Sequence, residues 1–387
     1  MKRKRHNDDD KEEEDRLSDL SDCVLLRILS LLNTKQAVQT CILSTRWKYL
    51  WKHLSNLKLH SSYFDTMDGF TEFAAQILSL RGHSTSLYSL KFYSDSMVQP
   101  HLIQRILKYV VSHDVQRFQL NLLYSIEHIP SCIFSCHTLT SLMLYVRHSD
   151  ATILFPDSLN LPALTKLSLW NFVFPIKKDG LAEPFSTLKK LNNLTIRSCQ
   201  VLHAQNLCIS SITLVHLKIQ THKKNYGEVE LYTPSLSTFA YAGIPFEKLC
   251  GSHLRSIKHV IIDAYMYVNN AEPPSNLLSW LKEFTEITSL TVTLTTLEVL
   301  SLVPNLLKVN FHSLRNLETL QVKKKGVSSG LSTTPMLARF SRLPMYYQDD
   351  VAKFRDEIFK EGSLSIPDKI VSFLLQNSPS AKVHKIY

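Results

Sequence analysis

The sequence predicts an α/β solenoid that begins with a short three-helix unit and ends in a helical cap. Three observations predict it: helical apolar spacing near the N-terminus, a short apolar pattern that then returns ten times, and two helical patterns after the last copy. With 387 residues, 44% of them hydrophobic, the chain can bury a substantial core. We divide it into a charged tail (1–15), a helical unit (16–59), a linker helix (60–85), the repeats (86–325) and the cap (326–387).

Residues 1–15 are nearly all charged or polar, so they cannot bury enough surface to offset the entropy of ordering, and we expect disorder. The basic cluster from Lys2 to Arg5 is typical of a nuclear import signal. It is equally typical of a solvated tail, because the acidic run from Asp8 to Asp15 follows at once. We therefore expect the protein in the nucleus or the cytoplasm.

Three short helices are predicted in residues 16–59, because apolar residues there recur at three- and four-residue steps. The first stripe holds Leu17, Leu20, Val24, Leu25, Ile28, Leu29 and Leu32. Asn33 and Thr34 can cap a second helix, and Ser44 or Thr45 a third that carries Trp47, Leu50, Trp51 and Leu54. So small a unit has little core of its own, so its apolar residues form either an internal core or a surface for a partner.

Apolar residues at i, i+3 and i+5 recur ten times beyond a linker helix predicted from Phe70 to Leu80. The copies are Leu87/Leu90/Phe92, Val115/Phe118/Leu120, Leu139/Leu142/Leu144, Leu164/Leu167/Leu169, Leu191/Leu194/Ile196, Leu214/Leu217/Ile219, Leu236/Phe239/Tyr241, Ile257/Val260/Ile262, Ile287/Leu290/Val292 and Leu317/Leu320/Val322. They start 21 to 30 residues apart, close to the period of about 20 to 29 residues that leucine-rich repeats have.

Each copy predicts a short strand whose i+3 and i+5 residues face the core while the residues between them face solvent. Stacked copies would form a curved parallel sheet with its outward residues on the concave side, an irregular leucine-rich repeat horseshoe. A clear helix follows the first strand, from Leu102 to Val111, whereas later return segments look irregular. The alternative is a chance set of Leu-rich strands in another β-containing fold.

After Lys325 the repeat pattern stops, and two helical patterns follow, from Val351 to Phe359 and from Ile366 to Leu375. Because a solenoid needs its last apolar layer covered, we expect a helical C-terminal cap.

Residue patterns that carry catalysis or bind a cofactor are absent from the sequence. It contains no GxxxxGK[ST], GxGxxG, HExxH, GxSxG or CxxC motif. The seven cysteines are scattered, and we interpret them as reduced packing residues with no metal site. No apolar run is long enough for a membrane span, and the first 16 residues lack a secretory core. We therefore expect no enzyme activity, cofactor, metal or membrane.

The net charge of +10 is spread along the chain without a long basic stripe that contains aromatic residues, so nucleic-acid binding is not favoured. The charge leaves a second hypothesis open, a repeat-based receptor for a small molecule or inositol phosphate.

The segment DRLSDLSDCVLLRILSLLNTKQAVQTCILSTRWKYLW, residues 15–51, resembles the F-box of plant F-box proteins with leucine-rich repeats. The order and spacing agree with that family's Asp-Arg, Leu-Pro, Leu/Ile-rich helix, Pro-Thr-Lys and Arg-Trp-x-x-Leu-Trp pattern. Ser21 and Asn33 stand where the family usually has proline, so each helix start loses a fixed φ, which bears on docking affinity. Residues 365–383 also resemble the tail that ends many of these proteins.

The resemblance implies a substrate-recognition adaptor of a Skp-cullin-F-box ubiquitin ligase. The helical unit would bind a Skp-type adaptor and through it a cullin, while the repeats would bind a target protein that the sequence does not identify. The positions implied for the adaptor contact are Leu20, Val24, Leu25, Ile28, Leu29, Leu32, Val38, Leu43 and Trp47.

Overall fold

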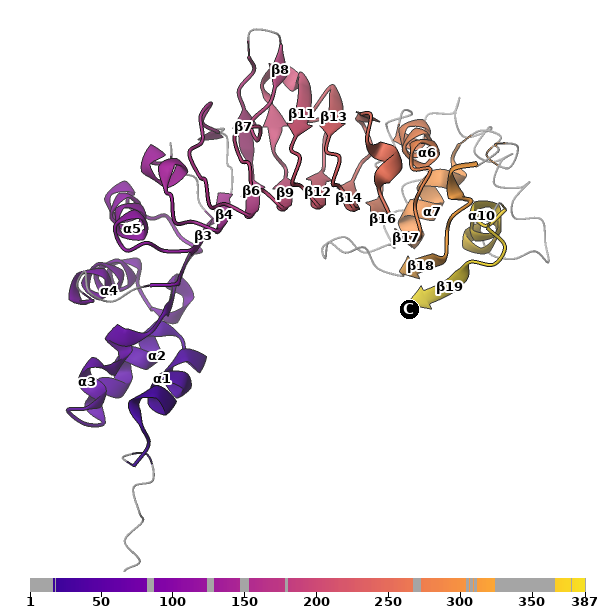
Figure 1. Cartoon of the computed structure of the whole chain (residues 1–387). Coiled ribbons are helices and arrows are strands. Elements are labelled where there is room, and N and C mark those ends of the chain that lie inside the picture. The colour runs from indigo at the N-terminus through magenta and orange to yellow at the C-terminus, as the bar shows by residue number, and fades with distance from the viewer. Residues whose placement is uncertain are drawn as a thin grey trace, which may run out of the picture.

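The computed structural model of the chain describes residues 17, 19–81, 87–123, 129–146, 153–177, 180–266, 273–303, 306, 309, 312–323, 366–376 and 378–386. It has the form of an arc, with three N-terminal helices at one end and a long sheet along the inner curve (Figure 1). Helices and two small sheets lie along the outer side. The charged tail of residues 1–15 and the helical pattern predicted at residues 351–359 lie outside the described residues.

The N-terminal helices are α1 (Asp22–Leu31), α2 (Thr34–Gln39) and α3 (Trp47–Leu50), with short 3-10 turns after α2 and α3. Asn33 caps α2: its side chain accepts a hydrogen bond from the Gln36 N–H at 2.9 Å, and the Gln36 side chain accepts one from the Asn33 N–H at 3.3 Å. This reciprocal pair supplies helix-starting contacts at a position where proline is common in the family. Ser21 makes no equivalent side-chain contact at the start of α1.

Twelve parallel strands form the long sheet, in the order β1-β2-β3-β4-β6-β9-β12-β14-β16-β17-β18-β19. Their bounds are β1 Asn56–His60, β2 Ser89–Ser94, β3 Arg117–Leu122, β4 Ser141–Val146, β6 Lys166–Trp170, β9 Asn193–Arg197, β12 His216–Thr221, β14 Thr238–Gly243, β16 His259–Ala264, β17 Ser289–Thr293, β18 Thr319–Lys323 and β19 Lys382–Ile386.

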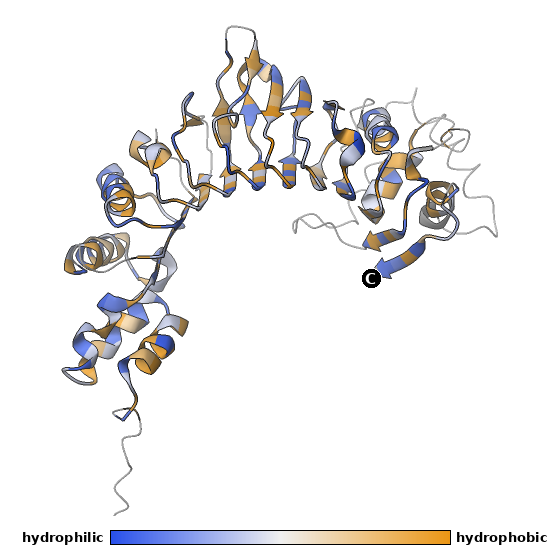
Figure 2. Ribbon diagram, in the orientation of Figure 1, coloured by the Kyte–Doolittle hydropathy of each residue, from blue (hydrophilic) through white to orange (hydrophobic). Residues whose placement is uncertain are grey.

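Ten consecutive strands, β2 to β18, are the ten predicted from the repeated apolar pattern, and they pair in register. The i+3 residues are direct partners from strand to strand, as in Leu142 to Leu167 to Leu194. Every i, i+3 and i+5 residue of the ten copies is at most 4% exposed. Figure 2 shows the resulting alternation of hydrophobic and hydrophilic bands along the strands. A parallel sheet built from stacked repeats is therefore present.

The sheet extends beyond the predicted strands at both ends. At the N-terminal end, β1 carries Leu57 and Leu59, and with Leu54 these buried residues repeat the i, i+3, i+5 spacing. At the other end, β19 places Val383 and Lys385 beside Leu320 and Val322. The first strand thus lies within the stretch assigned to the helical unit, and the predicted cap contains a strand as well as α10 (Ile366–Leu374).

The outer side changes character along the arc. Helices α4 (Met67–Leu80) and α5 (Pro100–Ser112) connect β1 to β2 and β2 to β3, so α4 belongs to the repeat array, whereas the sequence predicted a linker. Short strands follow in two parallel sheets, and helices α6 (Pro273–Glu283) and α7 (Leu294–Ser301) come after them. The strands are β5 Ile153–Leu154, β7 Phe172–Phe174, β10 Gln200–Val201, β8 Leu181–Ala182, β11 Asn206–Ser210, β13 Glu228–Tyr232 and β15 Lys248–Cys250. Among the described residues, no helix has the length and apolar character to span a bilayer.

Candidate binding surfaces

The nine residues implied for an adaptor contact divide into three groups by burial. Leu25, Leu29 and Trp47 are buried in the core of the N-terminal helices. Leu20, Ile28, Leu32 and Val38 are half-buried, and Val24 and Leu43 are exposed. A partner can therefore contact Val24 and Leu43 directly, while the buried three shape the surface from beneath.

Large apolar side chains that the resemblance did not point to are also exposed here. Ile42 is 85% exposed and Leu31 80%, compared with 58% for Leu43. We define the exposed apolar set as Leu17, Val24, Leu31, Ile42, Leu43 and Tyr49. Such a concentration at the solvent boundary is typical of a protein interaction site. The signal in the sequence is the adjacent pair Ile42 and Leu43, since two consecutive residues of a short helix cannot both face one small core.

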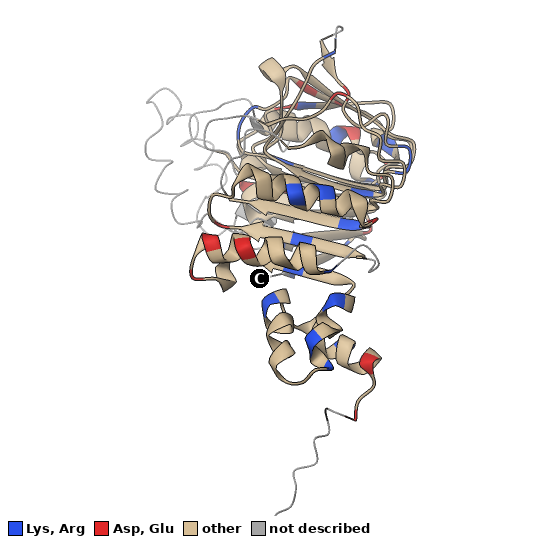
Figure 3. Cartoon of the chain, turned by 90° about the vertical axis from the view of Figure 1, so that its left-hand side faces the viewer, with Lys and Arg blue, Asp and Glu red and all other residues tan. Residues whose placement is uncertain are grey.

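Polar contacts fix these helices to one another and to the sheet. Arg46 forms an ion pair with Asp22 at 2.6 Å and donates to the Leu20 carbonyl at 2.5 Å. The Thr34 hydroxyl accepts a hydrogen bond at 2.8 Å from the Lys58 N–H, which joins α2 to β1. Figure 3 shows the helices from the N-terminal end of the arc, with acidic colour at the start of α1 and basic colour farther along. The unit is thus held at a defined place on the first strand.

The second surface is the inner face of the long sheet, made of the strand residues that alternate with the buried anchors. Within the twelve strands, all of which are described, the residues of this face include eight cations and one acid. The cations are Lys58, Lys91, Arg117, Lys166, Arg197, Lys218, Lys323 and Lys382, and the acid is Asp263. Asp263 is buried and accepts a hydrogen bond from the Thr293 hydroxyl at 3.1 Å. The solvent-facing charge of these strands is therefore positive.

Aromatic rings and one guanidinium form a row across neighbouring strands of the inner face. His60 stacks on Tyr93 with ring centroids 3.9 Å apart, and Tyr145 meets Trp170 edge-on at 4.3 Å. The Arg197 guanidinium lies over the Trp170 ring, 4.5 Å from its centroid. Contacts of these kinds are attractive, because a ring face is negative and a ring edge and a guanidinium are positive. The contact with the Trp170 ring therefore helps to hold the Arg197 guanidinium in place.

Several polar atoms of the inner face have no hydrogen-bond partner within the described structure: Arg197 Nε, Gln220 Oε1 and Asn121 Oδ1. Arg197 and Gln220 are direct partners on β9 and β12. Burial lowers the pKa of Arg197. Burial also lowers the pKa of Lys218, and the Arg197 charge adds to this while Asp263 opposes it. The shared cause is burial, which disfavours the charged form, and a bound anion would oppose that effect.

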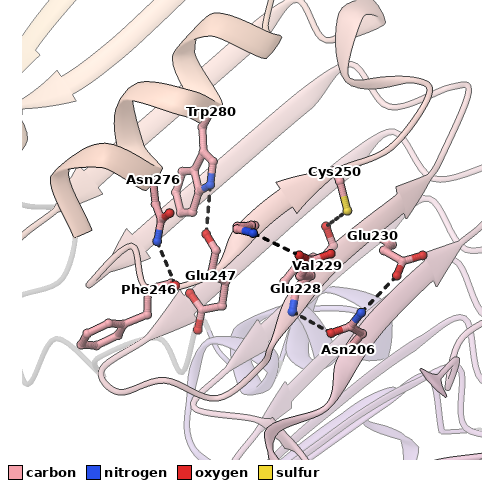
Figure 4. A network of polar contacts seen from close by, with 10 residues as sticks. Asn206, Glu228, Val229, Glu230, Phe246, Glu247, Cys250, Asn276 and Trp280 are labelled. Carbon is pink, nitrogen blue, oxygen red and sulfur yellow. Dashed lines mark hydrogen bonds and ion pairs between the residues drawn. The ribbon is translucent and has the colours of Figure 1, made fainter. Parts of the chain in front are cut away.

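A polar network on the outer side joins the small sheet of β8, β11, β13 and β15 to α6 (Figure 4). Asn276 donates to the Phe246 carbonyl at 2.9 Å, and Trp280 Nε1 donates to the Glu247 carbonyl at 3.1 Å. Asn206 accepts from the Glu228 N–H at 3.0 Å. The contacts of this network join the strands to one another and to α6, which indicates a structural role.

Glu247 is the buried acid of this region. Burial raises its pKa to about 7, and hydrogen bonds from Asn225 and its own backbone only partly oppose this. The neighbouring cavity, lined in part by Tyr226, Tyr241 and Trp280, measures about 10 Å³, room for no more than one water molecule. Among the described residues, no three His, Cys, Asp or Glu side chains gather as a metal site.

Comparison with known proteins shows which families this chain is similar to. Residues 17–59 match the model of the F-box domain. A putative F-box protein of Arabidopsis thaliana is 29% identical over 301 residues, which cover 73% of this chain and 68% of the relative. F-box/LRR-repeat protein 13 of the same plant is 33% identical over 164 residues, 41% of this chain and 36% of the relative. An F-box/FBD/LRR-repeat protein of that plant is 26% identical over 302 residues, 74% and 63%.

The chain has an F-box at residues 17–59 and is similar to plant F-box and F-box/LRR-repeat proteins. The F-box covers α1 to α3, and β1 with its anchors falls at the end of the matched stretch. F-box proteins are in general adaptors that bind Skp-type proteins of cullin ligases, and F-box/LRR proteins are in general non-catalytic subunits. The alignments cover between 36% and 68% of the lengths of these three relatives.

Proposed function

We propose that this chain is the substrate-recognition adaptor of a Skp-cullin-F-box ubiquitin ligase. Its N-terminal helices would bind a Skp-type adaptor and through it a cullin, while the inner face of the sheet would bind a target protein. The observation that carries the proposal is an F-box whose surface exposes the apolar set. No catalytic group in this chain is required, because holding target and ubiquitin donor together raises their effective concentration.

The docking contact would rest on the exposed apolar set and on the half-buried Leu20, Ile28, Leu32 and Val38. A few well-buried aliphatic or aromatic residues carry most of the free energy of such contacts. The exposure of Ile42, Leu31 and Leu43 makes them the strongest candidates, since each would lose the most water contact on binding. Leu25, Leu29 and Trp47 would act by holding the helices in place.

Co-purification with a Skp-type adaptor tests the docking half of the proposal. The variant Ile42→Asp/Leu43→Asp places charges in the contact without touching the buried core, and we expect at least a tenfold loss of adaptor recovery. Leu25 is unsuitable for this purpose, because a charge at a fully buried position would unfold the helices.

The matched control is Met97→Asp/Ile212→Asp. These two apolar residues are 72% and 71% exposed and lie outside the N-terminal helices, in the return segments of the repeats. This control should retain full adaptor recovery. Undiminished recovery with Ile42→Asp/Leu43→Asp, in a protein whose circular dichroism is unchanged, would contradict the docking assignment.

A repeat-based receptor for a small molecule or inositol phosphate is the second candidate, favoured by the cations of the inner face. Ligand binding to the folded state would raise the melting temperature with ligand concentration. A thermal-shift titration with inositol polyphosphates that leaves the melting temperature unchanged would remove this candidate.

A further inference from the structure

We propose that the inner face between β3 and β12 binds an acidic, extended peptide segment, with carboxylates at Arg197 and Lys218 and an aliphatic or aromatic side chain against Trp170. The proposal rests on the function proposed above, because it names the chemical class of the target that the repeats hold.

Charge complementarity is the first support. Arg117, Lys166, Arg197 and Lys218 face inward on four of the five strands from β3 to β12, and no acidic residue faces inward on any of the five, which the structure describes in full. A carboxylate beside Arg197 and Lys218 would gain both attraction and hydrogen bonds, since an ionised pair makes stronger hydrogen bonds than a neutral one. It would also oppose the effect of burial, which lowers the pKa of both cations.

Unpaired polar atoms give independent support. Gln220 is only 9% exposed, yet its Oε1 has no partner among the described residues, and the same holds for Asn121 Oδ1 and Arg197 Nε. These atoms are closed to solvent, so a bound peptide would pair with them once the side chains rotate toward the inner face. An extended peptide presents an N–H and a C=O at every residue, which are partners for both the acceptors and the donor. Buried polar groups without partners cost free energy, so pairing them on binding contributes to affinity.

The spacing of the cations favours a peptide over a compact polyphosphate. They lie on successive or alternate strands rather than converging on one point, and neutral residues such as Met143, Ser168 and Thr195 separate them. Carboxylates spread along a chain match this arrangement, and the rings of Tyr145 and Trp170 provide surface for the side chains between them. A compact polyanion would need several cations around a single site.

Fluorescence anisotropy with the full-length chain, co-expressed with a Skp-type adaptor, tests the proposal. The probe is a fluorescein-labelled peptide of four Glu-Tyr-Asp repeats, and its neutral counterpart has four Gln-Tyr-Asn repeats. We expect the acidic probe to bind at least tenfold more tightly. The variant Arg197→Gln/Lys218→Gln should weaken acidic-probe binding at least tenfold.

The matched control is Lys190→Gln/Lys282→Gln, which removes the same charge from exposed positions in a loop and on α6, away from the inner face. Its affinity for the acidic probe should stay within twofold of the parent chain. Equal loss in the two double variants would mean that net charge alone attracts the probe, and the proposal would be overturned.

Trp170 provides a readout of where the probe lies. Of the four tryptophans, all within the described residues, Trp47, Trp51 and Trp280 are buried and Trp170 is partly exposed. We expect the unlabelled acidic peptide to reduce acrylamide quenching of the tryptophan fluorescence. Unchanged quenching at saturating peptide would place the peptide elsewhere and overturn the assignment.

Two further outcomes separate this proposal from others. Displacement of the probe by a twelve-nucleotide single-stranded DNA at a lower concentration than the unlabelled peptide would identify a nucleic acid as the occupant and overturn the peptide. Adaptor recovery from the same preparations reports on docking independently. If the adaptor is recovered but the acidic probe does not bind, this inference fails while the docking half of the proposed function stands.

Discussion

Gly243 ends β14 at a place where only glycine fits. Its φ is +134°, and a Cβ there would lie 1.7 Å from the Thr221 carbonyl oxygen of the neighbouring strand. Gly243→Ala should lower the free energy of unfolding by roughly 3 kcal/mol or more, because the backbone of β12 would have to move. Urea unfolding measures the change.

Gly180 is the natural control, since its φ is +79° but no atom lies within 4 Å of the place that a Cβ would occupy. Gly180→Ala should cost about 1 kcal/mol, the strain of a left-handed backbone alone. Equal losses at the two glycines would show that the contact with Thr221 has no effect.

Glu247 gives the protein a pH-dependent stability. Because burial raises its pKa from 4.5 to about 7, the folded state binds a proton more tightly than the unfolded chain does. Its contribution to stability is complete below about pH 4.5 and is lost as the pH rises through about 7. At about 1.4 kcal/mol per pKa unit the loss is on the order of 3 kcal/mol.

Glu247→Gln should remove this dependence, since the amide resembles the protonated acid at every pH. The Tyr241 hydroxyl, 2.5 Å from the Ile244 carbonyl oxygen and 3.2 Å from Glu247 Oε2, has one proton, which the shorter contact takes. The proton shared between Tyr241 and residue 247 must then come from residue 247. The protonated acid and the amide can both supply it, whereas the carboxylate cannot. We expect the difference in urea midpoint between pH 5 and pH 8 to shrink in the variant, and an unchanged difference would assign the effect to other groups.

At the level of the strand, the buried anchors should dominate stability. Leu194 on β9 is 1% exposed and pairs with Leu167 and Leu217 on its two neighbours. Leu194→Ala should cost about 3 kcal/mol, from lost transfer free energy and the cavity left behind. Thr195→Ala, the next residue on the inner face, should change stability by about 0.5 kcal/mol or less. Similar losses at both positions would contradict the assignment of faces.

The strands that the sequence predicted share one property, a strict i, i+3, i+5 spacing of large apolar residues. β1 has that spacing too, but Leu54 stands 33 residues before Leu87, outside the usual repeat period, because α4 lengthens the connection. β19 was missed because Lys385 stands in an anchor position. The outer strands such as β5 and β10 are two residues long, too short to show any period.

For the candidate surfaces, the sequence predicted the helical unit, and the resemblance implied nine contact residues, of which only Val24 and Leu43 are exposed. Helical spacing identifies an apolar stripe. Much of that stripe is buried in the internal core with Leu25, Leu29 and Trp47, so it cannot contact a partner. Leu31 lies off that stripe and became evident only in three dimensions, whereas Ile42 could have been found from its place beside Leu43. The basic inner face was hidden for a similar reason, because its cations come from strands more than twenty residues apart.

Across the whole molecule, each strand is supported mainly by its neighbours, so opening should begin at the ends of the array. Within the described sheet, β19 pairs with β18 alone, whereas β12 has β9 and β14 on its two sides. We expect the amides of residues 382–386 to exchange with deuterium at least tenfold faster than those of residues 216–221. Equal protection would show that the array unfolds as one cooperative unit.

The in-register pairing of the strands also limits which residues of a bound peptide can align with side chains of the inner face. Neighbouring strands lie about 4.8 Å apart, while side chains on one side of an extended peptide repeat about every 6.7 Å. For a peptide that runs across the strands, the two spacings therefore coincide only about once in seven strands. Most of its side chains would fall between matching positions, so a few residues near one well-aligned point would decide which sequences are held.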